Sequence, residues 1–393
     1  MTSNIKIAIV HDYIKEYGGA ERVLEELHKL FPDAPIYTSI YAPEYLGPHR
    51  GAFEQMSAKG GSASGGKIKT SFLNLIPGRE KLISIFRLLS PFAFRNLNLS
   101  KFDVIIVSQT GAYFPNLVKK GSAKLVCYTH TPPRYLYGYM TAREWQKDPL
   151  TRFFGTIANH FLRLVDFKAS ENVDYFIANS EEIRSRIKKF YRQDATVINP
   201  PVDFPKNQEP RTKNQSYYLA GGRLARAKGI DIIIRAFNEN GKKLKVFGKG
   251  FAGFDEELRS IAKKNIEFVG EVTDDARVQL MECAKAYVFA SFDEDFGITP
   301  VEAMSVGTPV IAYRSGGVKE TVIDGKTGIF YSENTPEKLN EAVEKFEKTK
   351  ISSEACRKQA QKFSSEVFDR KIVDFIKSKL KSQNSNIKTI SQI

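Results

Sequence analysis

The chain has 393 residues, more than one hydrophobic core usually organises, so two domains are expected. Hydrophobic residues make up 42% of it, which excludes a largely disordered protein, and no apolar run is long enough to cross a bilayer. The net charge of +14 favours partners that carry phosphate, whether a nucleotide, a lipid surface or a nucleic acid. The three cysteines lack metal-site spacing and no export signal opens the chain, so we expect a cytoplasmic protein without a disulfide or zinc site.

The first half alternates short apolar runs with amphipathic helical patterns, which predicts a parallel sheet covered by helices. A glycine-containing turn at 17–20 leads into a predicted helix over 21–31, and Ser180 is a predicted cap for a helix that ends at Tyr191. The predicted strands are 5–10, 104–109, 124–130 and 174–180. Residues 1–203 are therefore expected to form an N-terminal Rossmann-like domain.

A second alternation of strands and helices follows a linker. Two prolines at 200 and 201 and a polar stretch to 214 mark the break, and a helix over 230–237 is flanked by further apolar runs. We expect a second Rossmann-like domain over 204–364, an amphipathic helix over 365–380 that packs back on the first domain, and a polar tail over 381–393. The glycine- and serine-rich run 59–66 is expected to be a flexible loop without chemistry.

The most informative segment is SFDEDFGITPVEAMSVG, residues 291–307, which joins a predicted strand to a predicted helix. Thr299 suits the N-cap of this helix, Pro300 its first position and Glu302 its third, which together form a capping box. Local structure alone therefore accounts for Glu302, although ligand binding stays open for it.

Capping does not account for the acidic cluster that precedes this helix. Glu294, Asp295 and Gly297 follow a predicted strand, where an open parallel sheet binds its ligands. Carboxylates accept hydrogen bonds from sugar hydroxyls, and N–H groups at a helix start hold phosphate. A nucleotide-linked sugar would satisfy both features.

With seven residues between them, Glu294 and Glu302 resemble the Glu-x7-Glu signature of glycosyltransferase family 4, retaining enzymes of the GT-B fold. The resemblance implies an α/β protein of two doubly wound Rossmann-like domains that face each other across a cleft. It also implies that the first glutamate lies by the donor sugar, that the second binds the nucleotide ribose, and that the N–H groups between them meet the donor. The candidate donor-binding residues in this segment are Glu294, Phe296, Gly297, Ile298, Thr299 and Glu302.

The resemblance covers nearly the whole chain. It includes Gly18-Gly19-Ala20-Glu21 near the start, then Gly222-Arg223-Leu224 and Lys228-Gly229 after the linker. The sequences YTHTPPRYLYG and INPPVD are similar to those of bacterial mannosyltransferase-like members that build polysaccharides. Several motifs in the expected order are more specific than one.

Arg223 and Lys228 follow a predicted strand with Gly222, so their cations are candidates to stabilise a leaving diphosphate. The alternative is a solvated basic loop. The sequence GKGFAG at 248–253 matches GxGxxG and leaves open a dinucleotide-binding oxidoreductase. The resemblance instead places Gly248 and Lys249 near the donor nucleotide.

Three groups of first-domain residues are further candidates. Gly18 and Gly19 either form a tight turn that requires a positive φ or let the backbone approach the donor. His130 ends a predicted strand and is either structural or, by the resemblance, beside the donor sugar. His11, Asp12 and Arg134 are candidates for the acceptor side.

Residues 67–101 interleave lysines and arginines with large apolar side chains. Two interpretations stay open, namely amphipathic helices that pack on the core and a face that lies on an anionic membrane. The second would bring the protein to a lipid-linked acceptor at the inner face of the plasma membrane.

The resemblance implies a retaining hexosyltransferase, with mannose from GDP-mannose as the first candidate donor, that acts in cell-surface polysaccharide biosynthesis. The partners expected from the resemblance are the nucleotide-sugar and a glycan or polyprenyl-lipid-linked acceptor. No separate cofactor and no nucleic acid are expected. No metal is expected either, because no DxD cation motif stands in the expected place. An NAD-type oxidoreductase and a basic nucleic-acid-binding protein are the alternatives.

Overall fold

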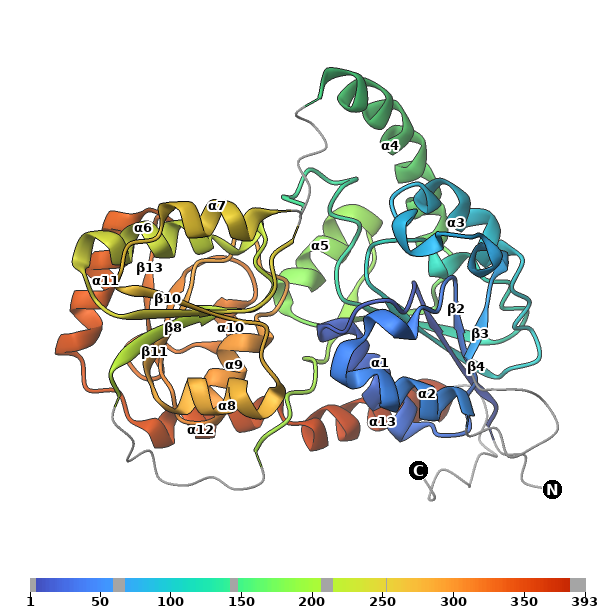
Figure 1. The fold of residues 1–393 in the computed structure, drawn as a ribbon. Helices are drawn as coiled ribbons and strands as arrows, with labels where there is room; N and C mark the ends of the chain where they lie inside the picture. The colour runs from blue at the N-terminus through green and yellow to red at the C-terminus, as the bar shows by residue number, and fades with distance from the viewer. Residues whose placement is uncertain (1–4, 59–67, 142–147, 206–214, 252, 382–393) are drawn as a thin grey trace. The chain divides into compact units, whose positions relative to one another are not determined.

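The computed structural model describes residues 5–58, 68–141, 148–205, 215–251 and 253–381, so the runs 59–66 and 206–214 and the tail from 382 lie outside the described residues. The chain divides into two compact units (Figure 1). Unit 1 comprises Met1–Gly138, Gln146–Pro201 and Ser365–Ile393, and unit 2 comprises Tyr139–Trp145 and Val202–Ser364. Within the described ranges, every helix is too short or too polar to span a membrane.

Unit 1 is built on a seven-stranded sheet in the order β3-β2-β1-β4-β5-β6-β7, all of whose neighbours are parallel. All six residues of β4 are buried, as expected of a central strand covered on both faces. The strands are β1 Ile7–His11, β2 Ile36–Thr38, β3 Ile68–Thr70, β4 Val104–Gln109, β5 Lys124–Thr129, β6 Tyr175–Ala178 and β7 Ala195–Val197. The four strands predicted in this half are confirmed.

The helices of unit 1 are α1 Gly19–Leu30, α2 Arg50–Ala58, α3 Phe86–Arg95, α4 Pro149–Ser170, α5 Glu181–Tyr191 and α13 Ser365–Lys381. Ser180 accepts a hydrogen bond from the Ile183 N–H at 3.1 Å, which confirms the predicted cap of α5. The apolar face of α13 joins the hydrophobic cluster that α1 and β1 share, and the ring of Phe368 lies 5.9 Å from that of Tyr128. The chain therefore returns to complete the core of its first unit.

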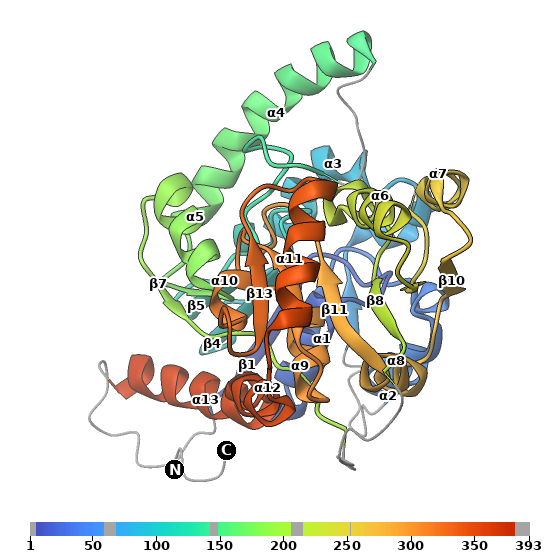
Figure 2. The same ribbon diagram turned by 90° about the vertical axis from the view of Figure 1, so that its left-hand side faces the viewer.

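Unit 2 repeats the architecture with a six-stranded parallel sheet in the order β10-β9-β8-β11-β12-β13. Its strands are β8 Tyr217–Gly221, β9 Leu244–Phe247, β10 Ile266–Gly270, β11 Ala284–Phe289, β12 Val310–Tyr313 and β13 Gly328–Tyr331. Its helices are α6 Ile230–Asn240, α7 Phe254–Ile261, α8 Asp274–Glu282, α9 Ile298–Ser305, α10 Val318–Thr321, α11 Pro336–Lys348 and α12 Ser353–Ala360. Figures 1 and 2 show α6 and α11 on one face of this sheet and α8, α9 and α12 on the other.

The strand order reverses once in each sheet. Chain order runs outward from β1 on one side and from β4 on the other, and in unit 2 the corresponding pair is β8 and β11. Open α/β sheets bind ligands outside the carboxyl ends of the strands at this reversal. Each unit therefore offers one such position, and the loops after these four strands are where site residues are expected.

Candidate functional site

The polar residues of unit 2 gather where β8 and β11 end. Lys228 closes a short turn after β8, and its Nζ donates to Oε2 of Glu294 at 2.6 Å. Ser291, two residues beyond β11, donates its hydroxyl to the same carboxylate oxygen. Glu294 is largely buried, with 16% of its side chain exposed, whereas 33% of Lys228 is exposed. The strand reversal thus holds a partly accessible ion pair.

A glycine pair after β12 encloses the backbone of Glu294. The Gly317 N–H donates to the Glu294 carbonyl oxygen at 2.7 Å. Gly316 has φ +67, and a Cβ there would lie 2.1 Å from the same oxygen. Only glycine permits this approach. The sequence interpretation missed Gly316 and Gly317, although a glycine doublet after a predicted strand is the signal it used for Gly18 and Gly19.

The predicted capping box of α9 is wrong. The helix begins at Ile298, and its N-cap is Gly297 with φ 91, which makes no side-chain cap hydrogen bond. A glycine that reaches a left-handed conformation lets the helix start two residues early, so Thr299 lies inside it. Glu302 consequently does not cap the helix, and its Oε1 lies 3.2 Å from Nη2 of Arg277 on α8. Capping no longer explains this carboxylate.

The remaining donor-side candidates differ in their surroundings. The ring of Phe296 is buried against Phe363, at 5.4 Å between centroids, so only its backbone is available to a ligand. A Cβ on Gly248 would lie 1.8 Å from the Gly222 carbonyl oxygen, so the loops after β8 and β9 meet backbone to backbone.

The other donor-side candidates are more accessible. Lys249 lies 3.4 Å from Glu271 in a well-exposed ion pair. Arg223 is exposed after β8, and Ile298 is half-buried.

In unit 1, two histidines share one serine at the strand reversal. Nδ1 of His11 lies 3.0 Å from Oγ of Ser108, and Nε2 of His130 lies 2.9 Å from that same oxygen. His11 ends β1, Ser108 is on β4, and His130 follows β5. Because a hydroxyl has one proton, Ser108 donates to one ring and accepts from the other when both rings are neutral. Ser108 escaped the sequence interpretation because a buried strand serine gives no pattern.

Asp12 is enclosed by the loop after β4. One carboxylate oxygen accepts hydrogen bonds from the Thr110 hydroxyl at 2.7 Å and from the N–H groups of Ala112 and Tyr113 at 3.0 Å. Burial raises the pKa of Asp12, although the neighbouring His11 and these donors oppose the rise. Asp12 therefore also organises the loop, beside its predicted acceptor role. Arg134, in the turn after His130, is half-buried.

Of the two interpretations of Gly18 and Gly19, the tight turn with a positive φ is excluded. Gly18 has φ −152, in the extended region, and neither glycine is among the residues with positive φ. Gly18 serves instead as the N-cap of α1, and a Cβ there would lie 3.3 Å from the Glu21 carboxylate. That carboxylate lies 3.5 Å from Nε2 of His11. The glycine thus leaves space beside the histidine pair.

Acidification is expected to destabilise the chain through His130. Burial, with a smaller contribution from His11, lowers the pKa of His130 to about 3. Below the unfolded pKa of about 6.5, only the unfolded state gains a proton, so the free energy of unfolding falls by up to about 1.4 kcal/mol per pH unit. Urea unfolding between about pH 6.5 and 5 should therefore show a shallower pH dependence for His130→Gln, by up to about 2 kcal/mol across this window.

His160→Gln, at an exposed position on α4, serves as the control and should keep the wild-type slope. Parallel stability curves for the wild type and His130→Gln would show that the buried ring does not govern this dependence.

Comparison with known proteins identifies the family. The profile described as "Glycosyltransferase Family 4" matches residues 17–205, and that described as "Glycosyl transferases group 1" matches residues 202–363. The chain belongs to glycosyltransferase family 4. Each profile covers one of the two Rossmann-like halves, so family membership rests on both units.

Two curated relatives and a solved structure are similar to the chain. An uncharacterized glycosyltransferase of Methanocaldococcus jannaschii is 30% identical over 204 residues, 50% of this chain and 57% of the relative. The alpha-1,3/1,6-mannosyltransferase ALG2 of Dictyostelium discoideum is 27% identical over 278 residues, 58% of this chain and 63% of the relative. The chain thus spans less than two thirds of either relative. The Anabaena protein HepE, solved with UDP and glucose, has a TM-score of 0.67 at 19% identity and covers 95% of this chain and 100% of its own.

The GT-B fold predicted from the family 4 resemblance is confirmed by these structural likenesses and by the two parallel sheets. The GxGxxG match at 248–253 follows β9, whereas the strand order reverses at β8 and β11. A dinucleotide fingerprint belongs to the first strand at the reversal, so the match does not fit that role. Among the described residues, no three His, Cys, Asp or Glu side chains gather as a metal site requires. The donor and acceptor roles of individual residues stay predictions.

Proposed function

We propose that the protein is a retaining glycosyltransferase that moves a hexose from a nucleotide-sugar to a glycan or polyprenyl-lipid-linked acceptor in cell-surface polysaccharide biosynthesis. Mannose from GDP-mannose is the first candidate donor, by analogy with the mannosyltransferases among the relatives. The observation that carries the proposal is the Lys228–Glu294 ion pair at the β8–β11 reversal. The protein would act in the cytoplasm at the inner face of the plasma membrane, where polyprenyl-lipid-linked acceptors are presented.

In this proposal unit 2 binds the donor. The first turn of α9 supplies N–H donors that its own helix does not use, and these suit a diphosphate. Glu294 would hydrogen-bond the sugar hydroxyls, and Glu302 the ribose. Lys228 is held near its place by Glu294 before the donor arrives and, with Arg223, would stabilise the leaving diphosphate.

Unit 1 would bind the acceptor through His11, Asp12 and Arg134, with His130 towards the donor sugar. In the transfer step, the bond between the anomeric carbon and the diphosphate oxygen breaks as the bond to the acceptor oxygen forms on the same face. The acceptor proton passes to the leaving diphosphate, so no protein nucleophile and no metal are needed. His130 enters the step neutral, because burial lowers the pKa of its ring to about 3.

A thermal-shift screen of GDP, UDP, ADP and NAD tests the donor class. A nucleoside diphosphate at 100 times its dissociation constant should stabilise the chain by about 2.7 kcal/mol. After incubation with GDP-mannose and acceptor, NMR of the product should show that the transferred sugar keeps the anomeric configuration that it had in the donor. The rate of transfer, measured separately, should be unchanged when EDTA is added. Stabilisation by NAD with no response to any nucleoside diphosphate would refute the proposal, and an inverted product would refute retention.

Glu302→Gln is expected to raise KM for the donor by about tenfold with a smaller change in kcat, because a ribose contact is made in both ground and transition states. Asp274→Asn is the matched control, since Asp274 also pairs with Arg277, at 2.8 Å, but is more exposed. Steady-state kinetics of both variants separate the two roles. An equal rise in KM for Asp274→Asn would mean that Glu302 acts only by positioning Arg277.

A further inference from the structure

A stripe of large apolar side chains lies exposed along α4. Between 46% and 70% of each is accessible, and, apart from one adjacent pair, they recur every three or four residues, which puts them on one face of the helix. They are Leu150, Phe153, Phe154, Ile157, Phe161 and Leu164. Such a face is normally buried in a core, and Figures 1 and 2 show α4 extending beyond the rest of unit 1.

The helix that carries this stripe is capped at its start and anchored to unit 1 in its C-terminal half. Asp148 caps its start by accepting from the Thr151 N–H at 2.7 Å. Near its end, Leu162 is buried in a cluster with Tyr135, and Asp166 accepts the Tyr137 hydroxyl hydrogen bond at 2.7 Å. Because the buried side of α4 packs on unit 1, the opposite side, which carries the stripe, is held facing outward.

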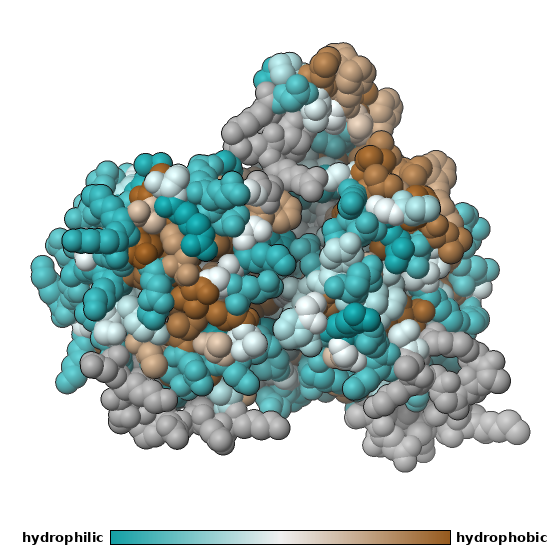
Figure 3. Space-filling model, in the orientation of Figure 1, coloured by the Kyte–Doolittle hydropathy of each residue, from teal (hydrophilic) through white to brown (hydrophobic). Residues whose placement is uncertain are grey.

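The apolar surface continues onto α3. Phe86 and Phe94 pack in the core, whereas Leu88 and Phe92 on the outer side are more than half exposed. The guanidinium of Arg87 lies 4.2 Å from the Tyr135 ring centroid, which links α3 to the cluster at the base of α4. Figure 3 shows hydrophobic atoms over both helices. The inner face of α3 thus packs on the core, as the first interpretation of residues 67–101 expects. Its outer face is exposed, as the second interpretation requires.

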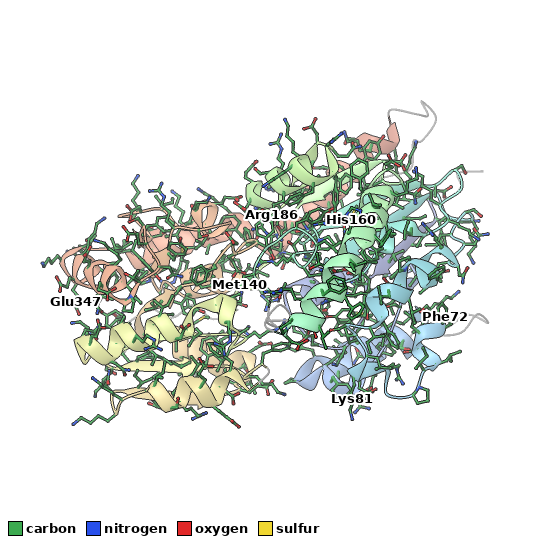
Figure 4. The ribbon with its side chains drawn as sticks, turned by 90° about the horizontal axis from the view of Figure 1, so that it is seen from above. Phe72, Lys81, Met140, His160, Arg186 and Glu347 are labelled. Carbon is green, nitrogen blue, oxygen red and sulfur yellow. The ribbon has the colours of Figure 1, made fainter. Side chains whose placement is uncertain are left out.

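The charges around the stripe favour one occupant. The exposed charged residues of α4 are Arg152, Arg163 and Lys168, while its acidic residue, Asp166, is buried. Arg163 donates to the Leu136 carbonyl oxygen at 3.2 Å, and Lys168 pairs with Glu171, just after the helix, at 2.6 Å. Lys81, in the turn before α3, is exposed as well (Figure 4). A second copy of α4 would offer these arginines no exposed carboxylate along the helix, because Asp148 caps its start and Glu171 already pairs with Lys168. An anionic lipid surface complements both the apolar stripe and its basic flanks.

We propose that the outer faces of α4 and α3 insert into the interface of an anionic phospholipid membrane, with Arg152 and Arg163 at the headgroups. The inference rests on the proposed place at the inner face of the plasma membrane and deepens it by naming the surface and the lipid class, and membrane binding by this face needs neither donor nor acceptor. It also makes α4, which the sequence interpretation did not single out, the main element of contact.

Vesicle co-sedimentation tests the proposal with the full chain. The wild type should bind vesicles of phosphatidylglycerol and phosphatidylcholine, and the triple variant Phe153→Gln/Phe154→Gln/Phe161→Gln should bind at least about tenfold more weakly. Arg152→Gln/Arg163→Gln should lose about fivefold per arginine at low salt. Thr156→Gln, an exposed polar position on α4, and Ile323→Gln, an exposed apolar one in unit 2, are the controls and should bind as the wild type does.

Insertion has its own readout. Trp145 is the single tryptophan, so the double variant Phe154→Trp/Trp145→Phe has its only indole on α4. The fluorescence of this indole should shift to the blue on anionic vesicles and be quenched by brominated lipid. Unchanged turnover of a soluble acceptor by the triple variant would separate this result from any failure of the transferase proposal. Absent vesicle binding by the wild type, equal binding by the triple variant, or a dimer that the substitutions dissociate would overturn the inference.

Discussion

Glu294→Gln is expected to lower kcat/KM for the nucleotide-sugar by about 10²- to 10³-fold, the cost of removing a preorganised electrostatic contact. The substitution keeps the shape of the side chain but removes the charge that holds Lys228 Nζ at 2.6 Å. Without it, the partly exposed lysine is free to turn to solvent. Because that exposure screens the ion pair, the free energy of unfolding should change by no more than about 1 kcal/mol.

Glu257→Gln is the matched control for this experiment. It removes another carboxylate from a salt bridge to the same loop, since Glu257 pairs with Arg226 in an exposed contact. Steady-state kinetics with a double-mutant cycle of Glu294→Gln and Lys228→Met should give strongly non-additive losses. Equal activity of Glu294→Gln and Glu257→Gln would contradict the proposed role of the ion pair.

The central strands were predictable from sequence because they are mostly apolar runs buried on both faces, whereas the three-residue strands β2, β3 and β7 were not predicted. Both β4 and β11 are of this kind, and each lies in the centre of its sheet. Helix starts were less predictable where glycine decides them. Local propensity favoured Thr299 as the cap of α9, yet Gly297 with φ 91 begins the helix earlier, because its loop must also fit the glycines after β12.

For the candidate site, the sequence located the residues at the ends of strands. It did not locate the residues that hydrogen-bond or pair with them. Glu294 and Lys228 stand in motifs that follow predicted strands, so both were candidates, and the structure adds that they pair. The partners Ser291, Ser108 and Arg277 come from a loop, a buried strand and a helix, and only the packing of these elements brings them to the motif residues. Contacts between distant segments carry no local pattern that a single sequence reveals.

Gly316→Ala is expected to lower kcat/KM by at least about 10²-fold, as much as the loss of Glu294 itself. The added Cβ would lie 2.1 Å from the Glu294 carbonyl oxygen and 2.6 Å from its nitrogen, so the loop that carries the carboxylate must move. Displacement of a catalytic group by about 1 Å costs rate even where the chain stays folded. Kinetics and thermal unfolding of the same preparation would separate the two effects.

Gly325→Ala isolates the clash from the backbone strain. Gly325 has φ +72, close to the φ +67 of Gly316, but a Cβ there meets nothing within 4 Å. Both variants should therefore share a loss of about 1 kcal/mol or more of stability from the left-handed conformation, and only Gly316→Ala should lose activity. Parallel losses of activity in the two variants would show that strain, and not the position of Glu294, limits the reaction.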